Sequence, residues 1–102
     1  MSRLNQYPLR TDVICEVTFR NEAGAVHDPD AVFFIVADPA DVETTYTYGT
    51  DPEIVRDGVG EYHVNVDAVL PGRWYYSFYS EGTGKAADER AFLVKKSHFV
   101  IP

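Results

Sequence analysis

The side chains that could carry out acid–base, nucleophilic or metal chemistry are few and lie far apart along this chain. The three histidines, His27, His63 and His98, fall in separate segments, without the spacing that is typical of a zinc site. His63 stands at an outward position of an alternating segment, which indicates a surface histidine. Cys15 occupies an apolar position, which predicts a small buried hydrophobic side chain. A nucleophilic thiol would need a positioned base, and no neighbour in sequence supplies one.

Aspartates are frequent between the apolar runs. The loop aspartates are Asp28, Asp30, Asp38, Asp41, Asp51 and Asp57. Loop carboxylates can hold calcium, but the spacing of an EF-hand loop is absent, and aspartate is also a common turn-forming residue. The pattern favours the turn role and leaves calcium open. A P-loop, a dinucleotide-binding glycine motif and a nucleophile elbow are all absent from the sequence. We therefore expect no enzymatic activity and no cofactor, and apart from calcium at a loop aspartate we assign no metal site.

Composition favours a single small β domain. The chain has 102 residues, and 14% of them are aromatic, with seven tyrosines and six phenylalanines. Tyr, Phe, Val and Thr are strand formers. The formal net charge of −7 repels phosphate backbones and anionic lipids, so we expect neither nucleic acid nor membrane as a partner. A single cysteine excludes an internal disulfide and fits folding in a reducing cytosol.

Short runs with strand patterns recur about every ten residues, with turn residues between them. Apolar and polar residues alternate in Asp12–Phe19 and Glu61–Asp67, which predicts strands with one buried face. Ala31–Ala37 is apolar at every position, and we interpret it as a strand buried on both faces. The other predicted strands are Val42–Tyr48, Ile54–Arg56, Arg73–Ser80 and Arg90–Val94. About seven such strands predict one antiparallel β-sandwich.

The two ends of the chain are predicted to be arms on this single domain of residues 1–102. The expected N-terminal arm covers residues 1–10, and the C-terminal arm covers residues 95–102. Apolar side chains in these arms could anchor the domain to a neighbour or add a strand to it. The candidate arm residues are Leu4, Tyr7, Phe99, Val100 and Ile101.

A glycine-rich turn before the strand Glu61–Asp67 is the strongest motif. Asp57 and Gly60 precede Tyr62 in the arrangement of the tyrosine corner of immunoglobulin-like domains, where the tyrosine hydroxyl bonds back to nearby backbone. Val64 stands where an antibody domain has cysteine, so the disulfide between the sheets is absent. An ordinary β-turn before an amphipathic strand is the alternative. Both interpretations are structural.

The second motif is the turn Pro71-Gly72, which leads into Arg73-Trp74. A Pro-Gly turn marks the start of a strand, and a Trp-led strand after such a turn is common in bacterial and phage immunoglobulin-like modules. We expect Trp74 to belong to the core.

Four large side chains fall on the parity opposite to the predicted core: Phe33, Ile35, Tyr75 and Tyr79. If their two strands are neighbours in one sheet, the four form an outer patch of the kind that marks a protein–protein contact. A terminal arm folded over the patch is the alternative, and the sequence favours neither.

The order of these pieces resembles a group of small immunoglobulin-like proteins encoded among the head and tail genes of tailed bacteriophages and prophages. The matching segments lie between Asp12 and Val94. They are Asp12–Phe19, Asn21-Glu22-Ala23-Gly24, Val32–Pro39, Thr45-Tyr46-Thr47-Tyr48-Gly49, Val55–Val64 and Pro71–Tyr76. The resemblance implies an immunoglobulin-like β-sandwich of about seven strands.

The same resemblance implies a virion protein made in the host cytoplasm. The expected role is a non-enzymatic capsid decoration, head–tail connector or tail-associated subunit. Its expected partners are other virion proteins or further copies of itself, as a homo-oligomer or attached to a symmetric assembly.

A carbohydrate- or host-surface-binding module is the alternative from another class. In that case Trp74, Tyr75 and Tyr79 would stack on sugar rings, and loop aspartates would supply hydrogen bonds.

Overall fold

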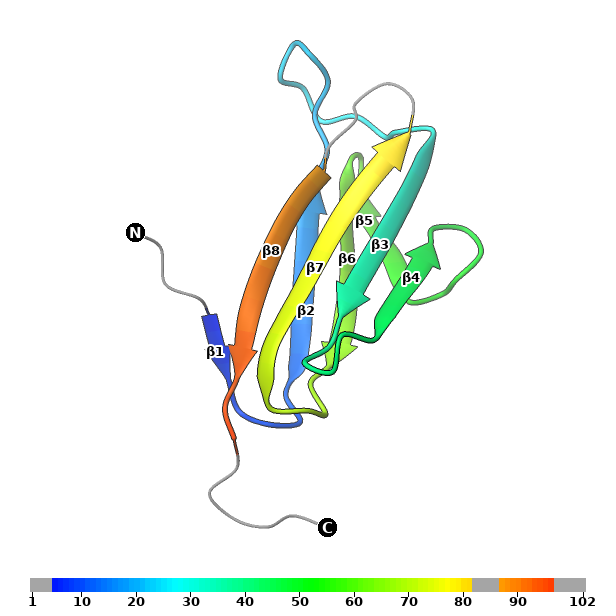
Figure 1. Ribbon diagram of the computed structural model, residues 1–102. Helices are drawn as coiled ribbons and strands as arrows, with labels where there is room; N and C mark the ends of the chain where they lie inside the picture. The colour runs from blue at the N-terminus through cyan, green and yellow to red at the C-terminus, as the bar shows by residue number, and fades with distance from the viewer. Residues whose placement is uncertain (1–4, 82–86, 97–102) are drawn as a thin grey trace.

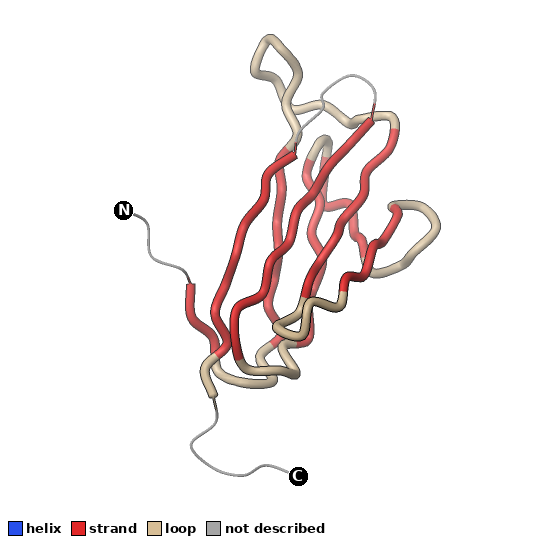
Figure 2. Tube along the Cα trace, in the orientation of Figure 1, coloured by secondary structure: helices blue, strands red, loops and turns tan. Residues whose placement is uncertain are grey.

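The chain folds into strands alone over the residues that the computed structural model describes, which are 5–81 and 87–96. Figure 2 shows strands joined by loops, with no helix in this part of the chain. The strands are β1 (Asn5–Tyr7), β2 (Asp12–Thr18), β3 (Ala31–Ala37), β4 (Glu43–Thr47), β5 (Ile54–Gly58), β6 (Glu61–Asp67), β7 (Gly72–Glu81) and β8 (Ala87–Val94). No helix long and apolar enough to cross a membrane occurs among the described residues.

Two sheets form two layers (Figure 1). The five-stranded sheet has the order β1-β8-β7-β3-β4, and the three-stranded sheet has the order β2-β6-β5. Alternation along each strand sends every second side chain between the layers. Buried residues of both sheets make up one core, among them Phe34 and Phe78 from one sheet and Cys15 and Val64 from the other. The predicted all-β, two-layered fold is therefore confirmed.

Strand β3 has the predicted bounds but not the predicted double burial. Val32, Phe34 and Val36 are buried, whereas the alternate residues Phe33 and Ile35 are only half-buried. The reason is that the three-stranded sheet covers one face of the five-stranded sheet, and no described element covers the other. The continuous apolar run therefore reflects two different environments, a core and an outer surface.

Part of the predicted N-terminal arm is a strand of the domain. Asn5–Tyr7 forms β1, which pairs with β8 in parallel. The prediction of a purely antiparallel sandwich is therefore wrong for this strand pair. The ring of Tyr7 packs edge-on against Phe92, with 5.7 Å between ring centroids. The backbone carbonyl of Tyr7 accepts a hydrogen bond from the amide of Lys95 at 2.8 Å. A three-residue strand is too short to show periodicity in the sequence. The other predicted arm residues, Leu4, Phe99, Val100 and Ile101, lie outside the described residues.

Candidate functional site

The outer face of the five-stranded sheet gathers the four side chains that the sequence placed opposite the core. Strands β3 and β7 lie side by side in the middle of this sheet (Figure 1), and Phe33 pairs with Tyr79 in their antiparallel register. Two residues further along, Ile35 pairs with Ser77, and Ala37 then pairs with Tyr75. The side chains of such pairs share one face of the sheet. The predicted patch is thus one continuous strip along two central strands.

Phe33 and Tyr79 make the most specific contact on this strip. Their rings stack with 5.0 Å between centroids and 19° between ring planes. Both residues are half-buried, whereas Tyr75 is 40% exposed. The stacked pair forms an aromatic surface that water still reaches, and such a surface releases water when a partner covers it.

A shallow hollow lies beside the stacked pair. Its lining includes Ile35, Ala37, Tyr75, Tyr76 and Ser77. Two exposed carboxylates complete the lining, Glu43 from the edge strand β4 and Glu89 from β8. Glu43 pairs with Ala37 and Glu89 pairs with Ser77, so each carboxylate stands next to a small side chain. Local sequence patterns do not predict a site at these two glutamates, because only the register of four strands places them here.

The described part of the N-terminal arm does not fold over the outer strip. Strand β1 extends the sheet at its edge, next to β8, instead of lying over the outer face (Figure 1). Leu9, at the end of this segment, packs against the core cluster. The described part of the N-terminal segment therefore leaves the outer strip open.

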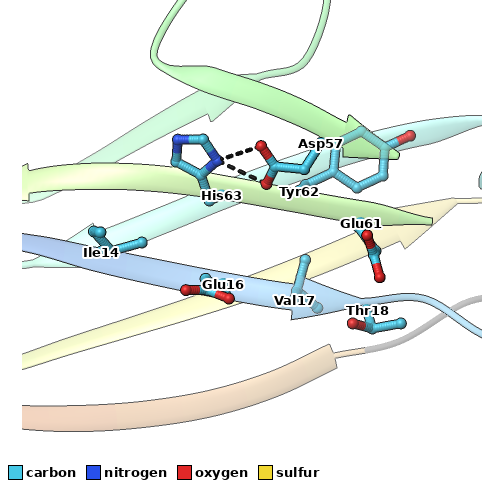
Figure 3. A pocket seen from close by; sticks show the side chains of 8 residues that line it. All are labelled: Ile14, Glu16, Val17, Thr18, Asp57, Glu61, Tyr62 and His63. Atoms are coloured by element: carbon cyan, nitrogen blue, oxygen red, sulfur yellow. Dashed lines mark hydrogen bonds and ion pairs between the residues drawn. The ribbon is translucent and has the colours of Figure 1, made fainter. Parts of the chain in front are cut away.

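The three-stranded sheet carries a second hollow on its own outer face. Figure 3 shows Glu16 and Thr18 of β2 near Glu61 and His63 of β6, and the imidazole Nδ1 of His63 lies 2.7 Å from a carboxylate oxygen of Asp57. An aspartate–histidine pair can orient a base, but a nucleophile must then lie within hydrogen-bond reach of the imidazole. Thr18 lies at the opposite end of the hollow in Figure 3. The arrangement fits a hydrogen-bonded side-chain pair on the surface.

The other residues considered for chemistry have structural roles. Cys15 is fully buried, as predicted, and burial raises the pKa of its thiol to about 12. Asp38 accepts hydrogen bonds from the amides of Ala40 and Val42, which is the predicted turn role. Asp51 likewise accepts from the amide of Thr47. Among the described residues, no group of three or more His, Cys, Asp or Glu side chains is placed to hold a metal ion.

Asp28 is the centre of a polar cluster that ties the loop between β2 and β3 to the β5–β6 hairpin. Its carboxylate accepts hydrogen bonds from Arg56 Nε at 3.3 Å and Nη2 at 2.9 Å, from the amide of Gly60 at 2.8 Å and from the hydroxyl of Tyr62 at 2.9 Å. The Arg56 guanidinium, and after it the Gly60 amide, hold the pKa of Asp28 well below its usual range. Burial, followed by the bond to Asp28, raises the pKa of Tyr62 to about 12.

This cluster corrects the predicted tyrosine corner. Tyr62 is buried, as that motif requires, but its hydroxyl donates to the distant Asp28 and not to nearby backbone. Gly60 has the positive φ expected of the turn, 72°, and the carboxylate of Asp57 contacts the imidazole of His63. The reason is positional: Tyr62 follows the hairpin turn from β5 to β6, whereas the corner of an immunoglobulin-like domain joins the two sheets.

Trp74 makes the bond that was predicted for Tyr62. Near the start of β7, just after the chain crosses between the sheets, its indole Nε1 donates to the carbonyl of Leu70, four residues upstream, at 3.0 Å. The ring is 5% exposed and stacks on Phe92. The core placement predicted for Trp74 is confirmed, and a stacking role on a sugar ring is thereby excluded for this residue.

The low pKa of Asp28 predicts a pH-dependent contribution to stability. Because the carboxyl pKa is lower in the folded chain than its unfolded value of about 4, the contribution is fully present above that value and is lost as the pH falls below it. We expect the Asp28→Asn variant to be less stable than the parent at pH 7, and the gap to shrink from about pH 5 toward pH 2. Urea unfolding of both proteins across this range measures the gap. A gap independent of pH would contradict the assignment.

The Trp74 bond predicts a second effect on stability. Trp74→Phe keeps an aromatic ring but removes the donor to Leu70 and leaves unfilled volume, so we expect a loss of about 2 kcal/mol in the free energy of unfolding. Tyr75→Phe, on the exposed side of the same strand, is the matched control and should change stability by less than about 0.5 kcal/mol. Urea unfolding monitored by far-UV circular dichroism measures both. Equal midpoints for the two variants would remove Trp74 from this role.

Comparisons of the chain with models of known protein families, with curated proteins and with solved structures find no match.

Proposed function

We propose that this chain is a non-enzymatic structural protein that acts by binding another protein with the outer face of its five-stranded sheet. The observation that carries the proposal is the strip of Phe33, Ile35, Tyr75 and Tyr79, which no other described element covers and which offers apolar and aromatic surface on two neighbouring strands inside the sheet. Aromatic residues are enriched in protein–protein interfaces and often contribute most of the binding energy.

We further propose that the sandwich is of the immunoglobulin-like type. When the strands are matched by their order along the chain, the larger sheet has β8, β7, β3 and β4 at the positions of strands G, F, C and C′ of such domains. The smaller sheet has β2, β6 and β5 at the positions of strands B, E and D. The bond of Trp74 to Leu70 near the start of β7 supports this reading, because the tyrosine corner lies near the start of strand F.

The particle in which this domain would work is that of a tailed bacteriophage or prophage. The order of motifs between Asp12 and Val94 resembles that of small phage proteins, which supports this part of the proposal. The resemblance concerns the fold and does not extend to a shared functional site. The domain would be a capsid decoration, a connector or a tail-associated subunit, and multiple copies on a symmetric shell would raise a modest single-site affinity through avidity.

Charge favours a partner other than a second copy of this chain. The chain has a formal net charge of −7, and the strip is flanked by Glu43 and Glu89. Two copies packed face to face would bring these carboxylates together in the interface, which is unfavourable. We therefore expect a monomer by light scattering across a dilution series. A concentration-independent oligomer that Tyr79→Lys dissociates would instead assign the strip to self-assembly.

The direct test is the composition of particles from the strain that encodes the chain. Particles are purified on a density gradient, and mass spectrometry measures the ratio of this chain to the main shell or tail subunit. A fixed ratio supports the proposal, and a Tyr79→Lys variant that stays folded but is missing from the particles would assign the strip as the contact. Absence of the chain from particles would overturn it. Saturable glycan binding at Tyr75 and Tyr79 in an NMR titration would then favour the carbohydrate-binding alternative.

A further inference from the structure

We infer that the hollow on the outer face of the five-stranded sheet binds an arginine side chain from the surface of a partner protein. The inference rests on the proposed function, since it names the chemistry by which the same face recognises its partner. It is carried by the placement of two carboxylates around an apolar and aromatic floor.

The shape of the hollow comes from an alternation of small and large side chains. On two neighbouring strands, Ser77 lies opposite Ile35, and Ala37 lies opposite Tyr75, so that the two small residues are diagonal to each other. The space above Ser77 and Ala37 is bordered by Tyr75 on one strand and Ile35 on the other. A slender chain of methylene groups fits over such a floor better than a bulky or branched group does.

The charge of the hollow specifies the end of that chain. Glu43 stands beside Ala37 and Glu89 beside Ser77, so carboxylates border the floor from β4 and β8, the strands that flank the β3–β7 pair. Among the described residues, neither a lysine nor an arginine lines the hollow. A neutral apolar ligand would cover the floor but would take water from two carboxylates without replacing it, which is unfavourable. A cation is attracted by both carboxylates and forms a charge-assisted hydrogen bond with one that it reaches.

Arginine fits this combination better than lysine. Its planar guanidinium can stack on the exposed ring of Tyr75 while the N–H groups at its edge donate to a carboxylate beside the hollow. The compact ammonium group of lysine is strongly hydrated and presents its donors from a single point. The stacked rings of Phe33 and Tyr79 lie along the same strip and would pack against apolar residues next to the arginine.

NMR titration of the full chain with short peptides tests the inference. The probe is acetyl-Gly-Arg-Gly-amide, and the control is the same peptide with citrulline, which has nearly the same shape but no charge. We expect binding in the millimolar range, with amide shifts confined to the strands around Ile35, Tyr75 and Glu89, and about tenfold weaker binding of the citrulline peptide. Equal binding of both peptides, or equal binding of a lysine peptide, would overturn the arginine assignment.

Charge-neutralising variants locate the site. The double variant E43Q/E89Q should lose about tenfold in affinity for the arginine peptide, while E16Q/E61Q, on the acidic face of the other sheet, should bind as the parent does. Shifts that spread over both faces, or equal losses in the two variants, would show attraction to net charge alone and would overturn the site.

Particle incorporation separates this inference from the proposed function. If E43Q/E89Q enters particles normally while Tyr79→Lys does not, the strip is the contact and the arginine assignment is wrong. If the parent chain is missing from particles but the arginine peptide binds as expected, the site is right and the virion role is wrong.

Discussion

Replacing Gly60 with alanine is expected to lower the free energy of unfolding by about 3 kcal/mol or more. Gly60 has a φ of +72°, which costs a residue with a Cβ about 1–2 kcal/mol. The added Cβ would also lie 2.6 Å from the carbonyl oxygen of Phe19 and 2.9 Å from the amide nitrogen and carbonyl oxygen of His27. These are backbone atoms, so no side chain can swing aside, and overpacking of this kind adds about 1–3 kcal/mol.

The surrounding backbone is held by its own hydrogen bonds, which is why the clash cannot relax cheaply. The amide of Phe19 donates to the carbonyl of Gly60 at 2.7 Å, and the amide of His27 donates to the carbonyl of Phe19 at 3.0 Å. A shift that relieves the Cβ would strain these bonds. It would also strain the bond from the Gly60 amide to Asp28, and thus the polar cluster that holds the loop.

Gly24→Ala is the matched control, because it isolates the cost of the backbone conformation. Gly24 has a φ of +84°, but no atom lies within 4 Å of the position that its Cβ would occupy. We expect a loss of about 1–2 kcal/mol for this variant. Urea unfolding of both variants at one temperature measures the difference. If the two losses are equal, the close approach at Gly60 contributes nothing and the turn there is looser than described.

The positions of the strands follow from the sequence because their physical causes are local. Alternation in Asp12–Thr18 and Glu61–Asp67 reflects one buried face per strand, and both strands occur with nearly the predicted bounds. The uniform apolar run Ala31–Ala37 gives a strand but not its environment, since an outer surface that is kept apolar has the same composition as a core. Only the layer structure separates the two.

The polar cluster and the hollow depend on long-range pairing, which local patterns do not encode. Asp28 meets Tyr62 across 34 positions of the chain, and the aspartate of a loop gives no sign of which strand it will contact. Glu43 and Glu89 border one hollow because four strands hold a particular register. A shift of one residue in any of these pairings would turn a glutamate to the opposite face.

The neighbouring residues Phe33 and Phe34 should differ sharply in what their loss costs. Phe34 is fully buried, and its ring centroid lies 4.7 Å from that of Phe78 and 5.8 Å from that of Tyr76. We expect Phe34→Ala to lose about 3–5 kcal/mol, from the lost burial and the cavity that remains. Phe33→Ala removes a half-buried ring whose stacking partner Tyr79 stays in contact with water, so about 1 kcal/mol is expected.

Urea unfolding of the two alanine variants measures this contrast directly, and the parent chain is the reference for both. Similar losses at the two positions would mean that the outer face is covered as the core is, and the proposed contact strip would then not exist. If Phe34→Ala loses much of the free energy of unfolding and Phe33→Ala loses little, the outer aromatic rings contribute little to the stability of the domain. Large aromatic rings that the stability of the domain does not require are then explained by a partner that covers them.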